Sequence, residues 1–162
     1  MKNRIGQGID VHQLEVGTPL IIGGVSIPYA KGSKGHSDGD VLYHAIVDAI
    51  LGALALGDMG QYFPSDDDCW KDVHSQKFME HAKTLMKKNG SDAVNIDSTI
   101  ILQEPRLNSY ILEMRENISH ILSMPIDAVS VKATTTDHLG LIGSGDGIAA
   151  TAVALITETD GN

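Results

Sequence analysis

Apolar residues along the 162-residue chain follow two spacings, and each predicts its own kind of element. Alternation at every second position, or a short apolar run, predicts strands over 4–12, 94–102, 128–134 and 147–157. Paired glycines between 20–22 and 25–27 predict a hairpin. Apolar residues three or four apart predict helices over roughly 41–56, 72–88 and 108–122, the first ending at Gly57. This order favours an α+β fold, in which a mixed β-sheet carries helices packed on one face.

The chain has the length of one domain, and residues 1–162 contain no internal repeat, linker or low-complexity segment. A sheet with helices on one face leaves its other face exposed. We therefore expect that other face to be buried in a homo-oligomer.

The net charge and the cysteine content limit the kinds of partner and of site that the chain can have. The formal net charge is −9 and no dense Lys/Arg stripe occurs, which argues against nucleic acid. The single cysteine, Cys69, excludes an intrachain disulfide and a cysteine zinc cluster. No apolar run reaches the length of about 18 residues that a membrane helix needs. We expect a cytoplasmic protein with neither a nucleic-acid nor a membrane partner, and an anionic substrate would need a bound metal or backbone N–H groups.

The strongest candidate chemistry combines a strand with the first helix. On a strand, Asp10 and His12 lie on one face, with their Cα atoms roughly 6–7 Å apart. With His44 from the helix they offer three metal ligands, which would leave tetrahedral zinc the open position typical of a catalytic site. Asp48, one turn further, either orients the second ring nitrogen of His44 or is a solvated residue. The alternative is that the histidines are hydrogen-bonded structural residues.

Two polar segments are candidates for anion binding. In the loop before the first helix, Ser37 or Asp38 fits the N-cap position and Asp40 the first turn, whereas His36 and Ser37 can also donate to an anion. At the end of a strand, 134–137 reads Thr-Thr-Thr-Asp. The threonines are either simple β-formers or a phosphate-binding array, with Asp137 able to hold Mg²⁺ or Mn²⁺. Spacing alone leaves both alternatives open.

These segments closely resemble the 2-C-methyl-D-erythritol 2,4-cyclodiphosphate synthase family, in matching order from about residue 4 to 157. The matching motifs run from Gly8 to His12, Ile22 to Pro28, His36 to His44, Ala55 to Gly60, Val131 to Thr136 and Gly147 to Ala149. The resemblance implies a homotrimer with active sites between adjacent subunits. It also implies a metal-dependent phosphorus-oxygen lyase of the non-mevalonate isoprenoid pathway. The 2-phosphate of 4-diphosphocytidyl-2-C-methyl-D-erythritol 2-phosphate would attack the β-phosphorus and expel CMP.

The same resemblance assigns roles to individual residues. Asp10, His12 and His44 match zinc ligands, and His36 and Thr135 match positions that support the transition state, with Ser37 beside His36. Contacts to the methylerythritol phosphate are implied for Asp58, Met59, Gly60, Phe63, Pro64, Ser65, Asp66 and Asp67. Contacts to cytidine and diphosphate are implied for Leu102, Pro105, Arg106, Leu107, Asn108, Ala133, Thr134, Thr136, Asp137 and Leu141. Asp137 also matches the ligand of a second divalent metal, Mg²⁺ or Mn²⁺.

Three positions depart from the family pattern. Asp137 stands where a glutamate is typical, which shortens the second-metal ligand by one methylene. Leu141 and Ser144 stand where many members have Phe and Arg at the trimer axis, so we expect weak or absent binding of isoprenoid diphosphates there. Ser65 stands where Asp is common.

Two other functions remain as alternatives at this point. A zinc-dependent phosphoesterase acting on a nucleotide-linked sugar alcohol would use water as the nucleophile and release phosphate. A non-catalytic trimer would use the metal only for structure.

Overall fold

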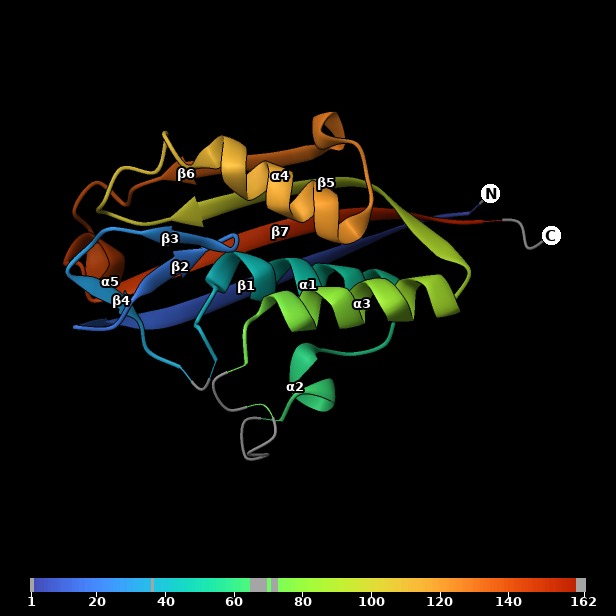
Figure 1. Cartoon of the computed structure of the whole chain (residues 1–162), viewed down its shortest axis with the longest axis horizontal. Coiled ribbons are helices and arrows are strands. Elements are labelled where there is room, and N and C mark those ends of the chain that lie inside the picture. The colour runs from blue at the N-terminus through green and yellow to red at the C-terminus, as the bar shows by residue number, and fades with distance from the viewer. Residues whose placement is uncertain (1, 36, 65–69, 71–72, 160–162) are drawn as a thin grey trace.

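The computed structural model describes residues 2–35, 37–64, 70 and 73–159. Its main sheet has five strands in the order β4-β1-β7-β5-β6, and a separate hairpin pairs β2 with β3 (Figure 1). The pair β5 and β6 is parallel and the other pairs are antiparallel, so the sheet is mixed as predicted. The strands are β1 (Asn3–Val16), β2 (Leu20–Ile22), β3 (Val25–Ile27), β4 (Lys31–Ser33), β5 (Ser91–Ile101), β6 (Val129–Thr134) and β7 (Gly147–Glu158).

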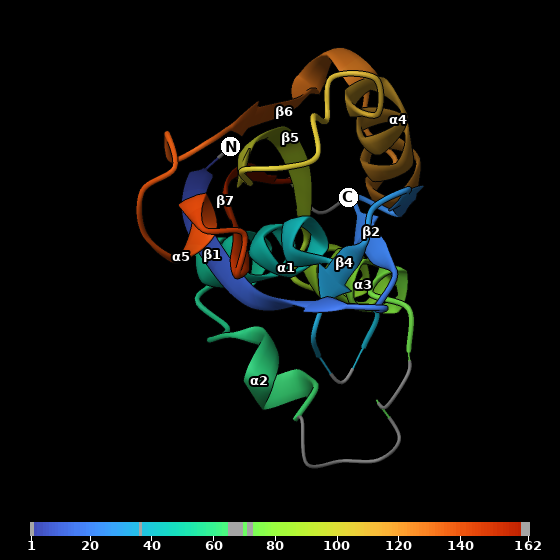
Figure 2. The same ribbon diagram turned by 90° about the vertical axis from the view of Figure 1, so that its left-hand side faces the viewer.

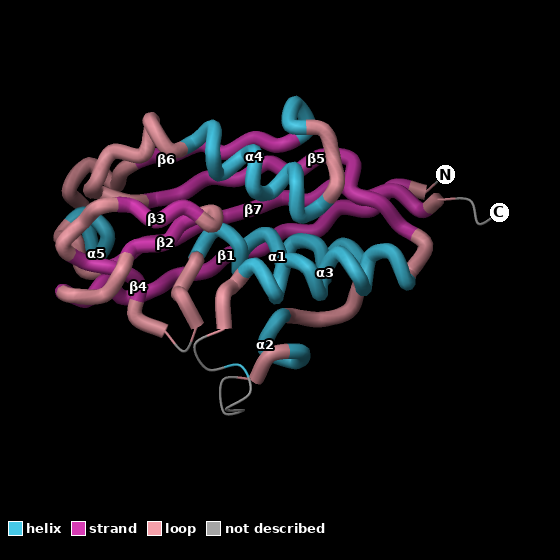
Figure 3. The backbone as a smooth tube through the Cα atoms, in the orientation of Figure 1, coloured by secondary structure: helices cyan, strands magenta, loops and turns pink. Residues whose placement is uncertain are grey.

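The three long helices lie on one face of this sheet (Figures 2 and 3), which confirms the predicted α+β arrangement. They are α1 (Val41–Leu54), α3 (Gln76–Lys88) and α4 (Ile111–Leu122), and the short ones are α2 (Met59–Tyr62) and α5 (Gly140–Gly143), with a 3₁₀ turn at Ile126–Ala128. Every helix within the described ranges is too short or too polar to cross a membrane.

The predicted boundaries are wrong in several places. The N-cap of α1 is Asp40, whose side chain accepts the Tyr43 N–H, rather than Ser37 or Asp38. The helix ends at Leu54, because Ala55 already takes a left-handed conformation with φ 58°, before Gly57. Helix α3 begins four residues later than predicted, and α4 three residues later. The short elements β4, α2 and α5 were not predicted, because three or four residues carry no periodicity.

Asp40 also ties the hairpin to α1. Its two carboxylate oxygens accept the N–H groups of Gly23 and Gly24 at 2.9 and 2.8 Å. Burial raises the pKa of Asp40 to about 6, although the N–H groups of Gly24, Gly23 and Tyr43 favour the charged form. The paired glycines therefore turn the chain and also supply the donors that satisfy a fully buried carboxyl group.

Helix α1 is the centre of the core and rests directly on β1. All of its residues except Asp48 and Gly52 are buried, as expected of a helix that is apolar around its whole circumference. A methyl group on Gly8 would lie 1.9 Å from the Ala45 carbonyl oxygen, and one on Gly6 would lie 1.9 Å from that of Ala49. The two glycines therefore let the helix backbone touch the strand.

We predict that Gly8→Ala lowers the free energy of unfolding by about 3 kcal/mol or more, because the added methyl must push α1 off the sheet. Chemical denaturation of the metal-free protein measures this. Gly52→Ala is the matched control in the helix itself, where the nearest atom would be 3.8 Å away. It should be neutral or stabilise by up to about 1 kcal/mol. Equal stability of Gly8→Ala and the wild type would contradict the close contact.

Candidate active site

The predicted metal ligands Asp10, His12 and His44 lie together. His12 Nε2 is 2.8 Å from Asp10 Oδ2, His44 Nδ1 is 3.0 Å from the same oxygen, and the two nitrogens are 3.2 Å apart. Asp10 and His12 project from the face of β1 that carries Gly6 and Gly8. His44 precedes Ala45, the residue that Gly8 contacts, so the glycine contact brings the helix ligand to the strand ligands.

This trio has the chemistry and the spacing of a divalent metal site. Two imidazole nitrogens and one carboxylate oxygen converge, with the atoms within 4.8 Å of one another. Such a donor set suits zinc and other transition metals. Ligands at 2.0–2.1 Å from a tetrahedral ion lie about 3.3 Å apart, close to the separations seen here. The residues therefore fit a three-ligand metal group.

The three side chains also perturb one another electrostatically. Burial would raise the pKa of Asp10, but hydrogen bonds and charges from His12 and His44 outweigh it and hold that pKa well below its usual range. Burial would lower the pKa of His12, but the hydrogen bond and charge of Asp10 outweigh it and raise that pKa. The carboxyl group is thus held in the ionised form that a metal ion requires.

The outer nitrogens of both imidazoles have partners of their own. His12 Nδ1 lies 2.9 Å from the carbonyl oxygen of Lys34. His44 Nε2 lies 2.9 Å from Ser75 Oγ. Of the two alternatives for Asp48, orientation of His44 is not realised, because Asp48 Oδ1 accepts the Met59 N–H at 2.8 Å. Sequence reasoning missed Ser75, which is far from His44 along the chain and belongs to no recognisable motif.

A pocket of about 200 Å³ opens beside the metal ligands. It is lined by His12, His44, Ser37, Met59, Phe63 and Phe78, among others. The structure therefore brings the predicted residues Ser37, Met59 and Phe63 to the metal ligands. Phe78 and Trp70, which also lines the pocket, were not predicted as site residues.

Other predicted contacts with the methylerythritol phosphate lie on or near α2. Asp58 caps this helix by accepting the Gln61 N–H at 3.2 Å, and Gly60 lies within it. Pro64 follows Phe63 at the end of the described segment. The predictions for His36, Ser65, Asp66 and Asp67 fall outside the described residues.

A second pocket, of about 110 Å³, forms where two predicted segments meet. It is lined by Leu102, Gln103, Pro105, Arg106, Leu107, Asn108, Ala133, Thr134 and Thr135. The segments 102–108 and 133–135 thus meet around one pocket, whereas their contact with cytidine and diphosphate stays a prediction. Gln103 was not predicted.

The end of the threonine run turns away from the strand. Asp137 is exposed, has φ 55° and donates its N–H to Thr135 Oγ1 at 3.2 Å. The Thr136 hydroxyl donates to the carbonyl oxygen of Leu139 at 2.7 Å, and Leu141 is exposed on α5. Ser144, at the position of the expected arginine, donates its hydroxyl to Asp146 Oδ2 at 2.6 Å.

The two pockets of one chain are well separated across the sheet. Asp10 pairs with Ala150, Ala150 with Ile100, and Ile100 with Ala133. Three strand spacings, about 14 Å, therefore separate the metal ligands from the threonine run at this level. The two pockets share none of their described lining residues.

Comparison with known proteins gives a consistent match over nearly the whole chain. The YgbB family model matches residues 3–157. The 2-C-methyl-D-erythritol 2,4-cyclodiphosphate synthase of Chloroherpeton thalassium is 52% identical over 155 residues, covering 96% of this chain and 99% of the relative. The protein of the same name from Geobacillus kaustophilus is 53% identical over 156 residues, with 96% and 99% covered.

Solved structures agree with the sequence relatives. The bifunctional IspDF of Campylobacter jejuni superposes with a TM-score of 0.94 at 38% identity; the match covers 98% of this chain and 43% of that one. IspF of Plasmodium falciparum, in a CDP complex, superposes with a TM-score of 0.86 at 36% identity over 98% and 97% of the two chains. With its fold, its Asp-His-His group and its sequence all in agreement, the chain belongs to the YgbB family, that of the 2-C-methyl-D-erythritol 2,4-cyclodiphosphate synthases.

Proposed function

We propose that the chain converts 4-diphosphocytidyl-2-C-methyl-D-erythritol 2-phosphate to 2-C-methyl-D-erythritol 2,4-cyclodiphosphate and CMP, as a phosphorus-oxygen lyase of the non-mevalonate isoprenoid pathway. The carrying observation is the Asp10, His12 and His44 group beside a pocket, in a chain about half identical to synthases of that name. A phosphoesterase is not favoured, because the full-length relatives are named for the cyclisation. The single cysteine fits a cytoplasmic location.

In the reaction, an oxygen of the 2-phosphate forms a bond to the β-phosphorus. The bond from that phosphorus to the bridging oxygen breaks, and CMP leaves with this oxygen. Phosphoryl transfer asks the protein mainly for positioning and charge stabilisation. No side-chain nucleophile is therefore needed.

We assign zinc to the group formed by Asp10, His12 and His44. Zinc bound there would polarise a phosphate oxygen as a Lewis acid and act as a template. The aromatic side chains of Phe63 and Phe78 make part of the pocket wall apolar. Ser37 Oγ accepts the Gly39 N–H at 3.2 Å, which leaves its proton available for a phosphate oxygen. We place His36 with Ser37 in this role.

The second pocket is proposed to hold the cytidine diphosphate part of the substrate. Its support is that 102–108 and 133–135 meet there, and that structures of two relatives are described as CDP-bound. Thr135 would support the transferred phosphate. Asp137, exposed at the end of this run, would hold Mg²⁺ or Mn²⁺ on the diphosphate, because these ions prefer oxygen ligands.

These two assignments require a neighbouring subunit. The β1 ligands and the threonine run of one chain lie about 14 Å apart across the sheet, too far for a single diphosphate to contact both. We therefore propose a homotrimer, in which the threonine run of one chain faces the metal ligands of the next. The sheet face opposite α1 fits such an interface, because Ile5, Ile9 and Val11 are 72, 63 and 54% exposed there. Val153 extends this apolar face onto β7.

We predict that light scattering gives the wild type the mass of three chains and that Ile9→Glu lowers the mass, because it places a charge in the interface. Leu112→Glu is the matched control, an equally exposed apolar residue on α4 that lies away from this face. It should keep the wild-type mass. A monomeric wild type, or an unchanged mass for Ile9→Glu, would contradict the proposed interface.

We predict that the zinc- and Mg²⁺-loaded enzyme, given its proposed substrate, releases CMP and the cyclic diphosphate in equal amounts. Phosphorus NMR with chromatography of the products measures this. His44→Ala should stay folded and lose at least about 100-fold in turnover, because a ligand of the metal is gone.

Inorganic phosphate without a cyclic product would instead support the phosphoesterase. Loss of zinc together with unfolding of His44→Ala would support a purely structural metal. Either result would contradict the proposed function.

A further inference from the structure

We propose that Ser75 and Asp38 are positioning residues that fix the ring tautomer of His44, so that its Nδ1 lone pair faces Asp10 and His12. This inference rests on the proposed metal site and adds two residues to which the proposed reaction assigns no part. It concerns the hydrogen bonds behind the metal ligands rather than the ligands themselves.

The contact behind His44 is short and excluded from water. His44 Nε2 and Ser75 Oγ are 2.9 Å apart, and Ser75 is 0% exposed. Ser37 Oγ lies 3.4 Å from the same nitrogen, at the outer limit for a hydrogen bond. Ser75 is therefore the principal partner of the outer nitrogen of His44.

The carboxylate of Asp38 decides the direction of this hydrogen bond. Its Oδ2 accepts the Ser75 N–H at 3.0 Å, and its Oδ1 accepts the Asp40 N–H at 3.2 Å and contacts Ser75 Oγ. An ionised carboxylate only accepts hydrogen bonds, so the one hydroxyl proton of Ser75 goes to Asp38. Ser75 Oγ then offers His44 only a lone pair.

It follows that Nε2 of His44 must carry the ring proton and donate it to Ser75. In a neutral imidazole the other nitrogen, Nδ1, then has the free lone pair that a metal ion needs. Nδ1 is the atom that lies 3.0 Å from Asp10 and 3.2 Å from Nε2 of His12. The chain from Asp38 through Ser75 to His44 thus aims the helix ligand at the metal position.

The ring proton of His12 is assigned by the same argument, with a different acceptor behind the ring. Its Nδ1 lies 2.9 Å from the main-chain carbonyl of Lys34, a group that only accepts. Its Nε2 is therefore left free for the metal. Both imidazoles are fixed from behind by obligate acceptors, as is usual for histidines that bind metals. For His12 the acceptor is backbone, whereas for His44 it is a side-chain pair that substitution can remove.

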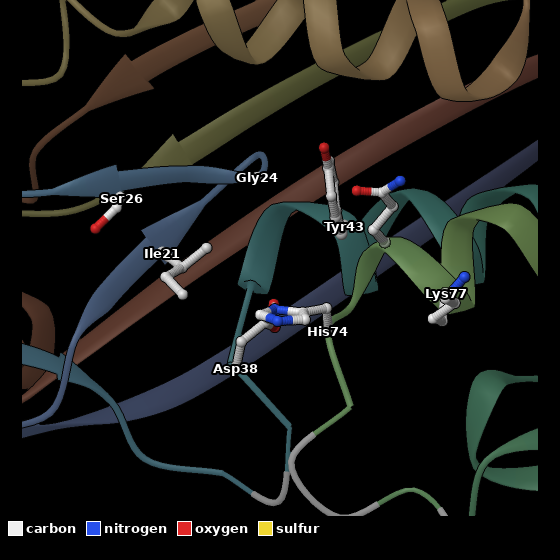
Figure 4. A pocket seen from close by; sticks show the side chains of 8 residues that line it. Ile21, Gly24, Ser26, Asp38, Tyr43, His74 and Lys77 are labelled. Carbon is white, nitrogen blue, oxygen red and sulfur yellow. The ribbon is translucent and has the colours of Figure 1, made fainter.

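Figure 4 shows Asp38 in the loop before α1 and His74 just before α3. The hydrogen bonds from Asp38 through Ser75 to His44, which we call the relay, therefore join the starts of two helices. Asp38 also borders a surface pocket of about 350 Å³ with Tyr43, His74 and Lys77. The simpler account is that Asp38 merely satisfies the N–H of Ser75 at the start of α3. A test must therefore separate this backbone contact from the relay to His44.

Ser75→Ala makes that separation, because it removes the hydroxyl and keeps the backbone N–H on Asp38. We expect the Kd for Zn²⁺, measured by competition with a chelator, to rise by about 10- to 100-fold. Ser98→Ala is the matched control. Ser98 is also buried, and its hydroxyl donates to the Ser130 carbonyl at 2.9 Å, away from the metal ligands. Its Kd for Zn²⁺ should equal that of the wild type.

The ring proton of His44 supplies a readout that a purely structural role would not move. Once zinc holds Nδ1 of His44, Nε2 carries the ring proton, and the chemical shift of that proton reports the acceptor behind it. Nitrogen-15 and proton NMR of the zinc-loaded proteins measure this shift. We expect a hydrogen-bonded Nε2–H in the wild type and in Ser98→Ala, and a proton signal shifted upfield in Ser75→Ala, which lacks the acceptor. Asp38→Asn, which replaces a carboxylate oxygen by a donor, should weaken the same hydrogen bond.

The inference is overturned if Ser75→Ala binds Zn²⁺ as tightly as Ser98→Ala, or if the Nε2–H signal of His44 is the same in Ser75→Ala as in the wild type. Both results leave CMP release by the wild type untouched, so they would not count against the proposed function. Conversely, a wild type that cyclises no substrate but shows the expected Nε2–H signal would contradict the function and support the relay. Should Asp38→Asn fail to fold, the Ser75→Ala and wild-type measurements still decide.

Discussion

The contact between the backbone of α1 and the glycines of β1 is the constraint on which the rest of the site depends. Any side chain at Gly6 or Gly8 would meet helix backbone atoms at 1.9 Å, so the helix can lie this close only to a bare strand. The next two inward-facing positions on the same strand are Asp10 and His12. The inner face of β1 thus contacts the helix backbone at Gly6 and Gly8 and supplies metal ligands at Asp10 and His12.

Polar contacts around α1 then fix the position of this helix on β1. Asp40 begins the helix and fastens the β2-β3 hairpin through two backbone N–H groups. Asp38, two residues earlier, accepts the N–H of Ser75 ahead of α3. The loop before α1 is therefore shaped by two carboxylates with separate tasks, one facing the hairpin and one facing α3. Between them, Gly39 takes a φ of 67°, a conformation that glycine adopts readily.

Sequence patterns predicted the parts of the fold and site that depend on periodicity. The two-residue period of a strand placed Asp10 and His12 on one face, and the helical period placed His44 on a helix. Periodicity could not show which acceptor each side chain would find. Asp48 lies one turn from His44, yet its carboxylate is taken by the Met59 N–H. Ser75 reaches His44 only through tertiary packing, so no local signal marks it. The residues implied by resemblance at 102–108 and 133–135 do meet in one pocket, although neither segment indicates this by itself.

The metal site is tested most directly by X-ray absorption at the zinc edge of the zinc-loaded protein, since this identifies the ligands without reference to activity. If Asp10, His12 and His44 hold the zinc, the spectrum shows two imidazole nitrogens and carboxylate oxygen at about 2.0–2.1 Å, with one imidazole lost in His44→Ala. A sulfur ligand at about 2.3 Å, or an unchanged spectrum in His44→Ala, would contradict the claim that α1 and β1 together form the metal site.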